Sequence, residues 1–276
     1  MVVWELETVS RFSAEQFGKH LFKLVVRRMM AAHIMQRVRA LMRLAKVLFC
    51  VARGAWALWR HQKDWSAAQR AQAVNRWAND MLRALGVTLQ VHGQPGSGPL
   101  FWVANHIAWL DILAVHAVRH CRFVAKSEVH HWPMIGRMAA EAGTLFIERA
   151  SRRDALRVVH DMAAALQSGD TVAVFPEGTT STGETVLPFH ANLLQAAIVT
   201  GAPVQPILIR YLNEAGHMAK HVRFVGEDTL AGSVWRVLMA STTCVCLDFL
   251  EPQYDQGRDR RAWARDLREV MLNRMQ

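Results

Sequence analysis

Residues 100–111 read Leu-Phe-Trp-Val-Ala-Asn-His-Ile-Ala-Trp-Leu-Asp, and this stretch decides how the rest of the chain is interpreted. Its first five residues are apolar and predict a buried strand, and the polar residues Asn105, His106 and Asp111 follow where that strand should pass into a helix. Open α/β sheets gather their functional groups at the carboxyl ends of strands, and buried polar groups cost free energy unless they are satisfied or used. A histidine beside a carboxylate is a candidate general base, although a hydrogen-bonded core histidine explains this stretch equally well by itself. For the two side chains to meet, the chain must make an irregular turn between His106 and Asp111.

The same alternation of apolar strand and helix continues along the chain, which predicts an α/β fold with a mixed, largely parallel sheet flanked by helices. No internal repeat and no Gly-, Pro- or Ser-rich linker interrupts it. We therefore expect one catalytic domain, residues 62–276, behind an N-terminal helical extension, residues 1–61. Strands are expected at 87–92, 100–104, 122–126, 144–147, 172–175, 204–209 and 222–225, and helices at 39–61, 65–85, 107–119, 128–142, 152–168, 189–200, 229–241 and 258–275.

Three further predicted strands also end in residues that suit an anion. Lys126 ends one strand, Arg149 follows another, and the loop Glu177-Gly178-Thr179 follows a third. Arginine binds phosphate through its planar fork, and a glycine beside hydroxyl-bearing residues permits close approach of an oxyanion. Each feature alone is equally well explained by a surface cation or a plain turn. Their convergence on one edge of the sheet favours an anion-binding site.

The sequence offers no protein nucleophile of the common kinds. No Gly-x-Ser-x-Gly elbow occurs, and the four cysteines have no spacing typical of metal ligands. A hydrolase would need one or the other. These observations favour a substrate hydroxyl that attacks an activated acyl group directly, without a covalent enzyme intermediate, and we expect no metal and no organic cofactor.

The positive charge of the chain is concentrated near its start. The 276 residues carry a formal net charge of +10, and the first 60 residues hold eleven basic residues against three acidic ones. A nucleic-acid groove needs a basic stripe on the folded domain, and the nearly neutral remainder does not provide it. An anionic membrane surface is therefore the expected partner, and nucleic acid is not.

The predicted helix at 39–61 is amphipathic. Its basic residues recur at helical spacing, and apolar residues that include two tryptophans occupy most of the remaining circumference. No run of 18 uncharged apolar residues is present, which disfavours a membrane-spanning helix and favours one that lies in the membrane interface. The alternative is a helix that packs on the core with a solvated basic face. The basic residues are Arg39, Arg43, Lys46, Arg53 and Arg60.

Four sequence blocks together carry a family resemblance. They are Asn-His-x4-Asp at 105–111, Gly-x-x-Phe-Ile-x-Arg at 143–149, Phe-Pro-Glu-Gly-Thr at 175–179, and an apolar strand with Pro203 and Pro206. In this order they resemble the lysophospholipid acyltransferase family, most of all its bacterial 1-acyl-glycerol-3-phosphate acyltransferases. The resemblance spans roughly residues 85–250, and it implies the fold of the glycerolipid acyltransferases.

The resemblance implies a reaction and a set of roles. His106 would deprotonate the sn-2 hydroxyl of lysophosphatidic acid, and Asp111 would orient the imidazole. The oxygen would then attack the thioester of acyl carrier protein or coenzyme A, giving phosphatidic acid in phospholipid biosynthesis. The acceptor is expected to be bound by Asn105, Trp109, Lys126, Arg149, Glu177, Gly178 and Thr179.

Two alternatives to this function stay open from the sequence. The acceptor could be another lysolipid, such as a lyso-ornithine lipid, whose head group has no phosphomonoester. A protein of a different class, a non-catalytic basic lipid-binding protein, is the more distant possibility. In either case we expect a peripheral or monotopic protein on the cytoplasmic face of the inner membrane.

Overall fold

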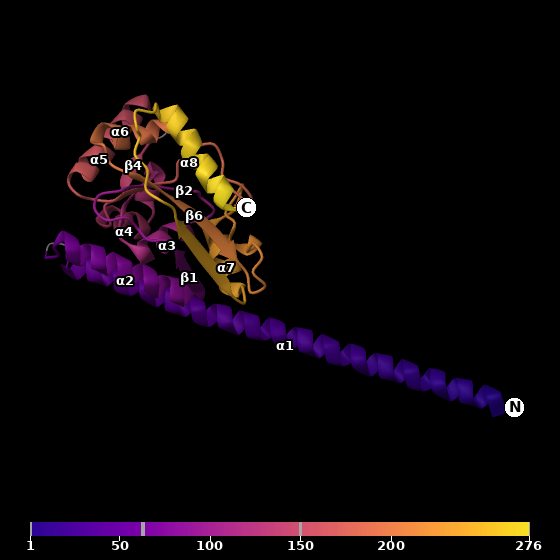
Figure 1. Cartoon of the computed structure of the whole chain (residues 1–276). Helices are drawn as coiled ribbons and strands as arrows, with labels where there is room; N and C mark the ends of the chain where they lie inside the picture. The colour runs from indigo at the N-terminus through magenta and orange to yellow at the C-terminus, as the bar shows by residue number, and fades with distance from the viewer. Residues whose placement is uncertain (1, 62–63, 149–150, 276) are drawn as a thin grey trace.

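The computed structural model describes residues 2–61, 64–148 and 151–275, and in these residues seven strands form one sheet. The strand order is β1-β7-β6-β2-β5-β3-β4 (Figure 1). From β6 to β4 neighbouring strands are parallel, whereas β7 is antiparallel to β6 and parallel to β1, so the sheet is mixed. The bounds are β1 Val87–His92, β2 Phe101–Ala104, β3 Arg122–Lys126, β4 Leu145–Ile147, β5 Val172–Val174, β6 Val204–Leu212 and β7 Thr243–Phe249.

Helices cover both faces of the sheet, because the central strands are apolar on both sides. Trp102 of β2 belongs to one core cluster, and its neighbours Phe101 and Val103 belong to the other. The first cluster includes residues of α1 (Val2–His61), α2 (Ala67–Leu85), α3 (Leu110–Val118) and α7 (Leu230–Met239). The second includes residues of α5 (Arg152–Gln167), α6 (Gln195–Thr200) and α8 (Arg260–Met275).

The N-terminal helix α1 runs from Val2 to His61, and its first half extends well away from the domain (Figure 1). Its last part packs against α2, which returns alongside it, and against α7. Helix α2 begins with a capping box between Ser66 and Gln69. It ends at Gly86, whose φ of 75° is a left-handed conformation that glycine adopts without strain.

Most of the predicted basic face of α1 contacts the domain. A helix lying in the membrane interface would instead direct this face toward the lipid head groups. Arg39 and Arg43 donate to carbonyl groups at the carboxyl end of α7, Arg53 pairs with Asp80 of α2, and Lys46 is exposed. The arginines reach these partners because α1 docks through small buried residues between them, leaving the flanking side chains within reach of α7 and α2. The outward face is apolar instead, with Val38, Leu41, Met42, Leu48, Phe49, Trp56 and Trp59 exposed.

Several expected elements differ from the structure. Strand β7 is not among the predicted strands, the helix expected at 39–61 begins at Val2, and the helix expected at 189–200 is a 3-10 turn, Ala191–Leu194, followed by α6.

Two further differences have a local physical explanation. Residues 222–225 form no strand: a short 3-10 helix, Lys220–Val222, leads into irregular backbone, and the N–H of Phe224 bonds to the carbonyl of Ile107. The predicted helix 128–142 is divided into a 3-10 turn, Ser127–His131, and α4, Ile135–Glu141. Pro133 lies between them, and proline interrupts helices because it lacks a backbone N–H and its ring clashes with the preceding turn.

Candidate active site

His106 and Asp111 lie at the carboxyl end of β2, where β5 and β6 flank it. Residues 105–108 leave the strand in an irregular turn, and α3 begins only at Leu110, so Asp111 stands in its first turn. This turn brings Nδ1 of His106 to 2.8 Å from Oδ2 of Asp111. The spacing of five residues, which does not suit one face of a regular helix, is therefore accommodated by the turn.

Asp111 is fully buried and surrounded by hydrogen-bond donors. Its Oδ2 accepts from the backbone N–H groups of Ile107 and Ala108 at 2.7 and 2.9 Å, and its Oδ1 accepts from the hydroxyl of Tyr211 at 2.7 Å. Such donors stabilise an ionised carboxylate. Burial, and then the charge of Asp111, raise the pKa of Tyr211 well above its ordinary value, so this hydroxyl stays a donor.

The hydrogen bonds assign the tautomer of His106. A carboxylate oxygen that already accepts two backbone N–H groups acts as the acceptor toward Nδ1, so Nδ1 carries the proton. The lone pair of Nε2 is then available to take a proton from a bound alcohol. The side chain is 20% exposed, which leaves it accessible.

The loop after β5 holds His106 from two sides. The ring of Phe175 stacks on the imidazole, with the centroids 3.9 Å apart and the planes 9° from parallel. The N–H of His106 donates to Oε1 of Glu177 at 3.1 Å, and its carbonyl accepts from the N–H of Ser181 at 2.7 Å. These contacts orient the imidazole before any substrate binds.

Glu177 is a buried carboxyl group within this loop. Burial raises its pKa to about 7, although the N–H of His106 acts in the opposite direction. Its Oε2 is buried without a hydrogen-bond partner in the described part of the chain. The next residue, Gly178, has φ of 69°, and a Cβ there would stand 2.8 Å from the ring of His190. Only glycine fits this turn without strain.

Asn105 and Trp109 make contacts within the protein. The side chain of Asn105 is buried and exchanges two hydrogen bonds with the backbone of Ile209, at 3.0 and 2.7 Å, which ties the end of β2 to β6. The indole N–H of Trp109 donates to the hydroxyl of Ser233 on α7 at 3.1 Å. The structure thus gives both side chains contacts that position the turn around His106.

Three further predicted binding residues are Lys126, Thr179 and Arg149. Lys126 ends β3 and forms an exposed ion pair with Glu128 at 2.7 Å. Thr179 is exposed in the loop after β5. Arg149, which the sequence predicts as a phosphate ligand, lies outside the described residues.

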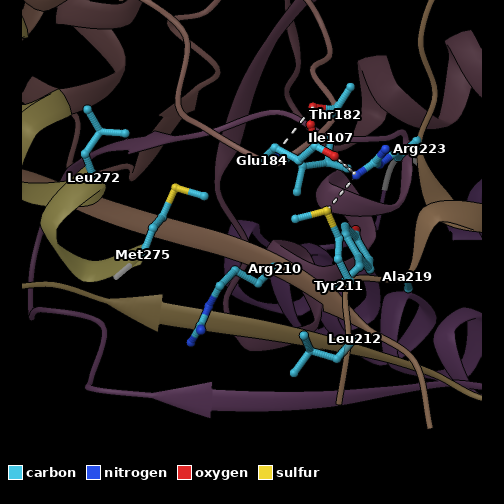
Figure 2. A pocket seen from close by; sticks show the side chains of 12 residues that line it. Ile107, Thr182, Glu184, Arg210, Tyr211, Leu212, Ala219, Arg223, Leu272 and Met275 are labelled. Carbon is cyan, nitrogen blue, oxygen red and sulfur yellow. Dashed lines mark hydrogen bonds and ion pairs between the residues drawn. The ribbon is translucent and has the colours of Figure 1, made fainter. Parts of the chain in front are cut away.

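A cavity of about 450 Å³ lies on the β6 side of this turn (Figure 2). We call it the β6 cavity. Tyr211 lies on the wall of this cavity. The sequence did not predict its contact with Asp111, because no motif marks the end of β6, and it did not predict the stacking of Phe175 on His106. The lining residues are Ile107, Thr182, Gly183, Glu184, Arg210, Tyr211, Leu212, Met218, Ala219, Arg223, Leu272 and Met275.

Within residues 2–61, 64–148 and 151–275, no group of three or more potential metal ligands occurs. The same residues include no helix whose length and hydropathy would let it cross a bilayer.

Comparison with known proteins identifies the class of enzyme. The acyltransferase family model matches residues 86–210, which include the turn at His106 and the loop after β5. The lyso-ornithine lipid O-acyltransferase of Pseudomonas aeruginosa is 35% identical over 243 residues, 86% of this chain and 93% of the relative. The chain therefore belongs to the acyltransferase family and is an acyltransferase, as the resemblance predicts.

Two further proteins are similar. The 1-acyl-sn-glycerol-3-phosphate acyltransferase of Neisseria meningitidis is 36% identical over 223 residues, 79% of this chain and 85% of the relative. The crystal structure of the 1-acyl-sn-glycerophosphate acyltransferase of Thermotoga maritima superposes with a TM-score of 0.64 at 22% identity, over 87% of this chain and 97% of that one. This likeness places the fold with that of a known acyltransferase.

Proposed function

We propose that this enzyme transfers a fatty acyl group from a thioester to the free sn-2 hydroxyl of lysophosphatidic acid. The observation that carries the proposal is the buried Asp111 that holds His106 with Nε2 free, at the carboxyl end of β2 and next to the loop after β5. The relatives from Neisseria meningitidis and Neisseria gonorrhoeae bear the name of this activity. The product would be phosphatidic acid.

The proposed reaction proceeds in one acyl transfer. Nε2 of His106 accepts the hydroxyl proton while the lipid oxygen attacks the thioester carbonyl carbon. The carbon–sulfur bond then breaks, and the leaving thiolate takes the proton from the imidazolium. Asp111 stabilises the transient imidazolium, because its negative charge lies 2.8 Å from the ring nitrogen in a buried site. No acyl-enzyme forms.

The proposal also includes how the acceptor is bound. Lys126, Arg149 and the loop Glu177-Gly178-Thr179 are proposed to contact the head group, with Glu177 binding a hydroxyl because a carboxylate would repel a phosphate. The donor is proposed to be the thioester of acyl carrier protein or coenzyme A, and no cofactor is needed.

A lyso-ornithine lipid is the second candidate acceptor. Relatives of this chain from Pseudomonas aeruginosa, Brucella abortus and Rhizobium meliloti carry the name lyso-ornithine lipid O-acyltransferase. The match to the Pseudomonas aeruginosa protein covers 93% of that protein. The proposed base would act on its hydroxyl in the same way.

Membrane association is proposed to use the outward face of α1. This face exposes Phe49 at 68% and Trp59 at 70%, and large exposed apolar patches mark interaction surfaces. Exposed Arg37, Lys46 and Arg60 lie on the same helix and would contact anionic head groups on the cytoplasmic leaflet. The protein would then be peripheral or monotopic.

The test is an acyl transfer assay with the purified full chain. Labelled acyl carrier protein or coenzyme A thioester is supplied with lysophosphatidic acid or with lyso-ornithine lipid, and the diacylated product is quantified. Product from lysophosphatidic acid supports the proposal, and product from lyso-ornithine lipid alone supports the second candidate. Failure to acylate either acceptor contradicts both.

A further inference from the structure

Arg223 lies on the wall of the β6 cavity (Figure 2). Ile107, the residue after His106, lines the same cavity, and its carbonyl accepts a hydrogen bond from the N–H of Phe224 at 3.2 Å. The hydroxyl of Thr180 donates to the carbonyl of Phe224. The segment that carries Arg223 is thus bonded to both loops that surround the imidazole.

The guanidinium of Arg223 is mostly buried and only partly paired. Its side chain is 18% exposed, and its Nη2 donates to Oε1 of Glu184 at 2.7 Å and contacts the sulfur of Met218 at 2.8 Å. Its Nε is buried and has no hydrogen-bond partner among the described residues. Because Glu184 is 62% exposed, water screens this ion pair. The cation therefore retains the capacity to bind a further oxygen.

Arg210 lines the same cavity but is matched within the protein. Its Nη2 donates to Oδ2 of Asp248 at 2.7 Å, and Asp248 is buried with 2% of its side chain exposed. Its Nε also lacks a partner among the described residues, and Asp248 also contacts Nη2 of Arg274 at 3.4 Å. The pair of Arg210 with Asp248 is nevertheless less screened by water than the pair of Arg223 with Glu184, because Asp248 is buried. In Figure 2 Arg210 extends away from Ile107 and Glu184, whereas the guanidinium of Arg223 lies beside them.

We propose that Arg223, on the wall of the β6 cavity, binds an anionic oxygen of the acceptor head group together with the residues proposed above, and so contributes to which lysolipids are acylated. The inference rests on the proposed function and adds a residue to it. The ligand chemistry is a phosphate or carboxylate oxygen, which a guanidinium binds through two N–H groups. Glu184 competes for the same cation, and the apolar side chains of Leu212 and Leu272 on the cavity wall suit the adjoining hydrocarbon.

Binding is measured without turnover in the His106→Ala background. The probes are a short-chain lysophosphatidic acid and a short-chain lyso-ornithine lipid below their micelle-forming concentrations, with a neutral monoacylglycerol as the uncharged comparison. Adding Arg223→Gln should raise the Kd of the anionic probe about ten- to a hundredfold and leave the neutral probe unchanged. The probe that responds identifies phosphate or carboxylate as the ligand. Arg265→Gln, at an exposed position on α8, removes the same charge elsewhere and should change neither.

Glu184→Gln separates ligand binding from a structural role of the ion pair. If Arg223 serves the head group, this variant should tighten anion binding about two- to fivefold, because a competitor is removed. Arg223→Lys keeps the charge and should restore part of the affinity. An unchanged Kd for both anionic probes in folded Arg223→Gln, or weaker binding in Glu184→Gln, overturns the inference. Acyl transfer by the wild-type chain is scored separately, so this failure does not coincide with failure of the proposed function.

Discussion

The buried carboxylate of Asp111 organises the candidate site at the scale of single residues. It accepts from two backbone N–H groups, from Tyr211 and from His106, so the ring is held in one tautomer. Contacts within the protein therefore orient the ring, as the proposed general base requires.

Replacing His106 by alanine should remove the proposed base. We expect kcat to fall on the order of 10²- to 10⁴-fold, while the chain still folds and unfolds in a cooperative transition. Steady-state acyl transfer and thermal unfolding measure the two effects. Near-normal turnover would rule out general base catalysis by this imidazole.

Tyr211→Phe should leave Oδ1 of Asp111 buried without its donor. We expect the free energy of unfolding to fall by about 1 to 3 kcal/mol, with a smaller loss of kcat than in His106→Ala, since Nδ1 keeps its acceptor. Urea denaturation and initial rates test this. Unchanged stability would mean that the hydroxyl does not support the carboxylate.

Glu177→Gln should alter how stability depends on pH. The pKa of this carboxyl is raised from 4.5 to about 7 in the folded state. Between these values the folded chain binds more protons than the unfolded chain, so the group makes stability fall as pH rises, and the full penalty is present above pH 7. The glutamine keeps an oxygen for the N–H of His106. The free energy of unfolding of the variant minus that of the wild type should therefore be larger at pH 8 than at pH 4, by on the order of 2 kcal/mol. Urea denaturation of both proteins at the two pH values measures this. The same difference in stability at pH 4 and pH 8 would contradict the prediction.

At the scale of elements, arginine side chains of α1 hold this helix against the domain. Arg43 donates to the carbonyls of Leu238 and Ala240 at 3.1 and 2.7 Å, where the carboxyl end of α7 carries partial negative charge. This docking, and not exposure to lipid, explains part of the basic periodicity in the sequence.

Arg43→Met should therefore destabilise the domain. We expect a loss of about 1 to 3 kcal/mol in the free energy of unfolding, because the carbonyls at the end of α7 lose a charged donor. Lys46→Met, at an exposed position of the same helix, is the control and should change stability little. Equal effects of the two substitutions in urea denaturation would argue against this capping contact.

At the scale of the whole molecule, α1 runs along one side of the domain and extends beyond it (Figure 1). The face of α1 that the domain leaves uncovered is apolar. Burial of such a face in the interfacial region of a bilayer gains free energy in proportion to its apolar area. The docked arginines leave this face, and the exposed cations beside it, available to lipid.

The double substitution Leu48→Glu and Phe49→Glu should release the protein from anionic vesicles in a flotation assay. The matched control is Leu156→Glu with Val199→Glu. These two residues are apolar and exposed, and their helices, α5 and α6, cover the other face of the sheet. The control should float like the wild type. Flotation of both variants would exclude the outward face of α1 as the membrane contact.

Much of the architecture could be predicted from local patterns. The strands at 87–92 and 122–126 have the predicted bounds, and the polar residues after β2 and β5 lie at one edge of the sheet. The error at 222–225 has a tertiary cause: its backbone bonds to the turn at Ile107, and an apolar run alone does not reveal which partner a segment will find.

The sequence by itself determined most of the alternation of strands and helices. It also identified His106 and Asp111 as a possible pair, because the groups of the turn that joins them lie within six residues of one another. Only the tertiary structure decided that Tyr211, 100 residues from Asp111, supports the carboxylate, and that Phe175 stacks on the imidazole. It also decided the direction of the basic face of α1 and the place of Arg223 beside the site. These contacts join distant segments, and their partners are set by how the layers pack, which no local spacing encodes.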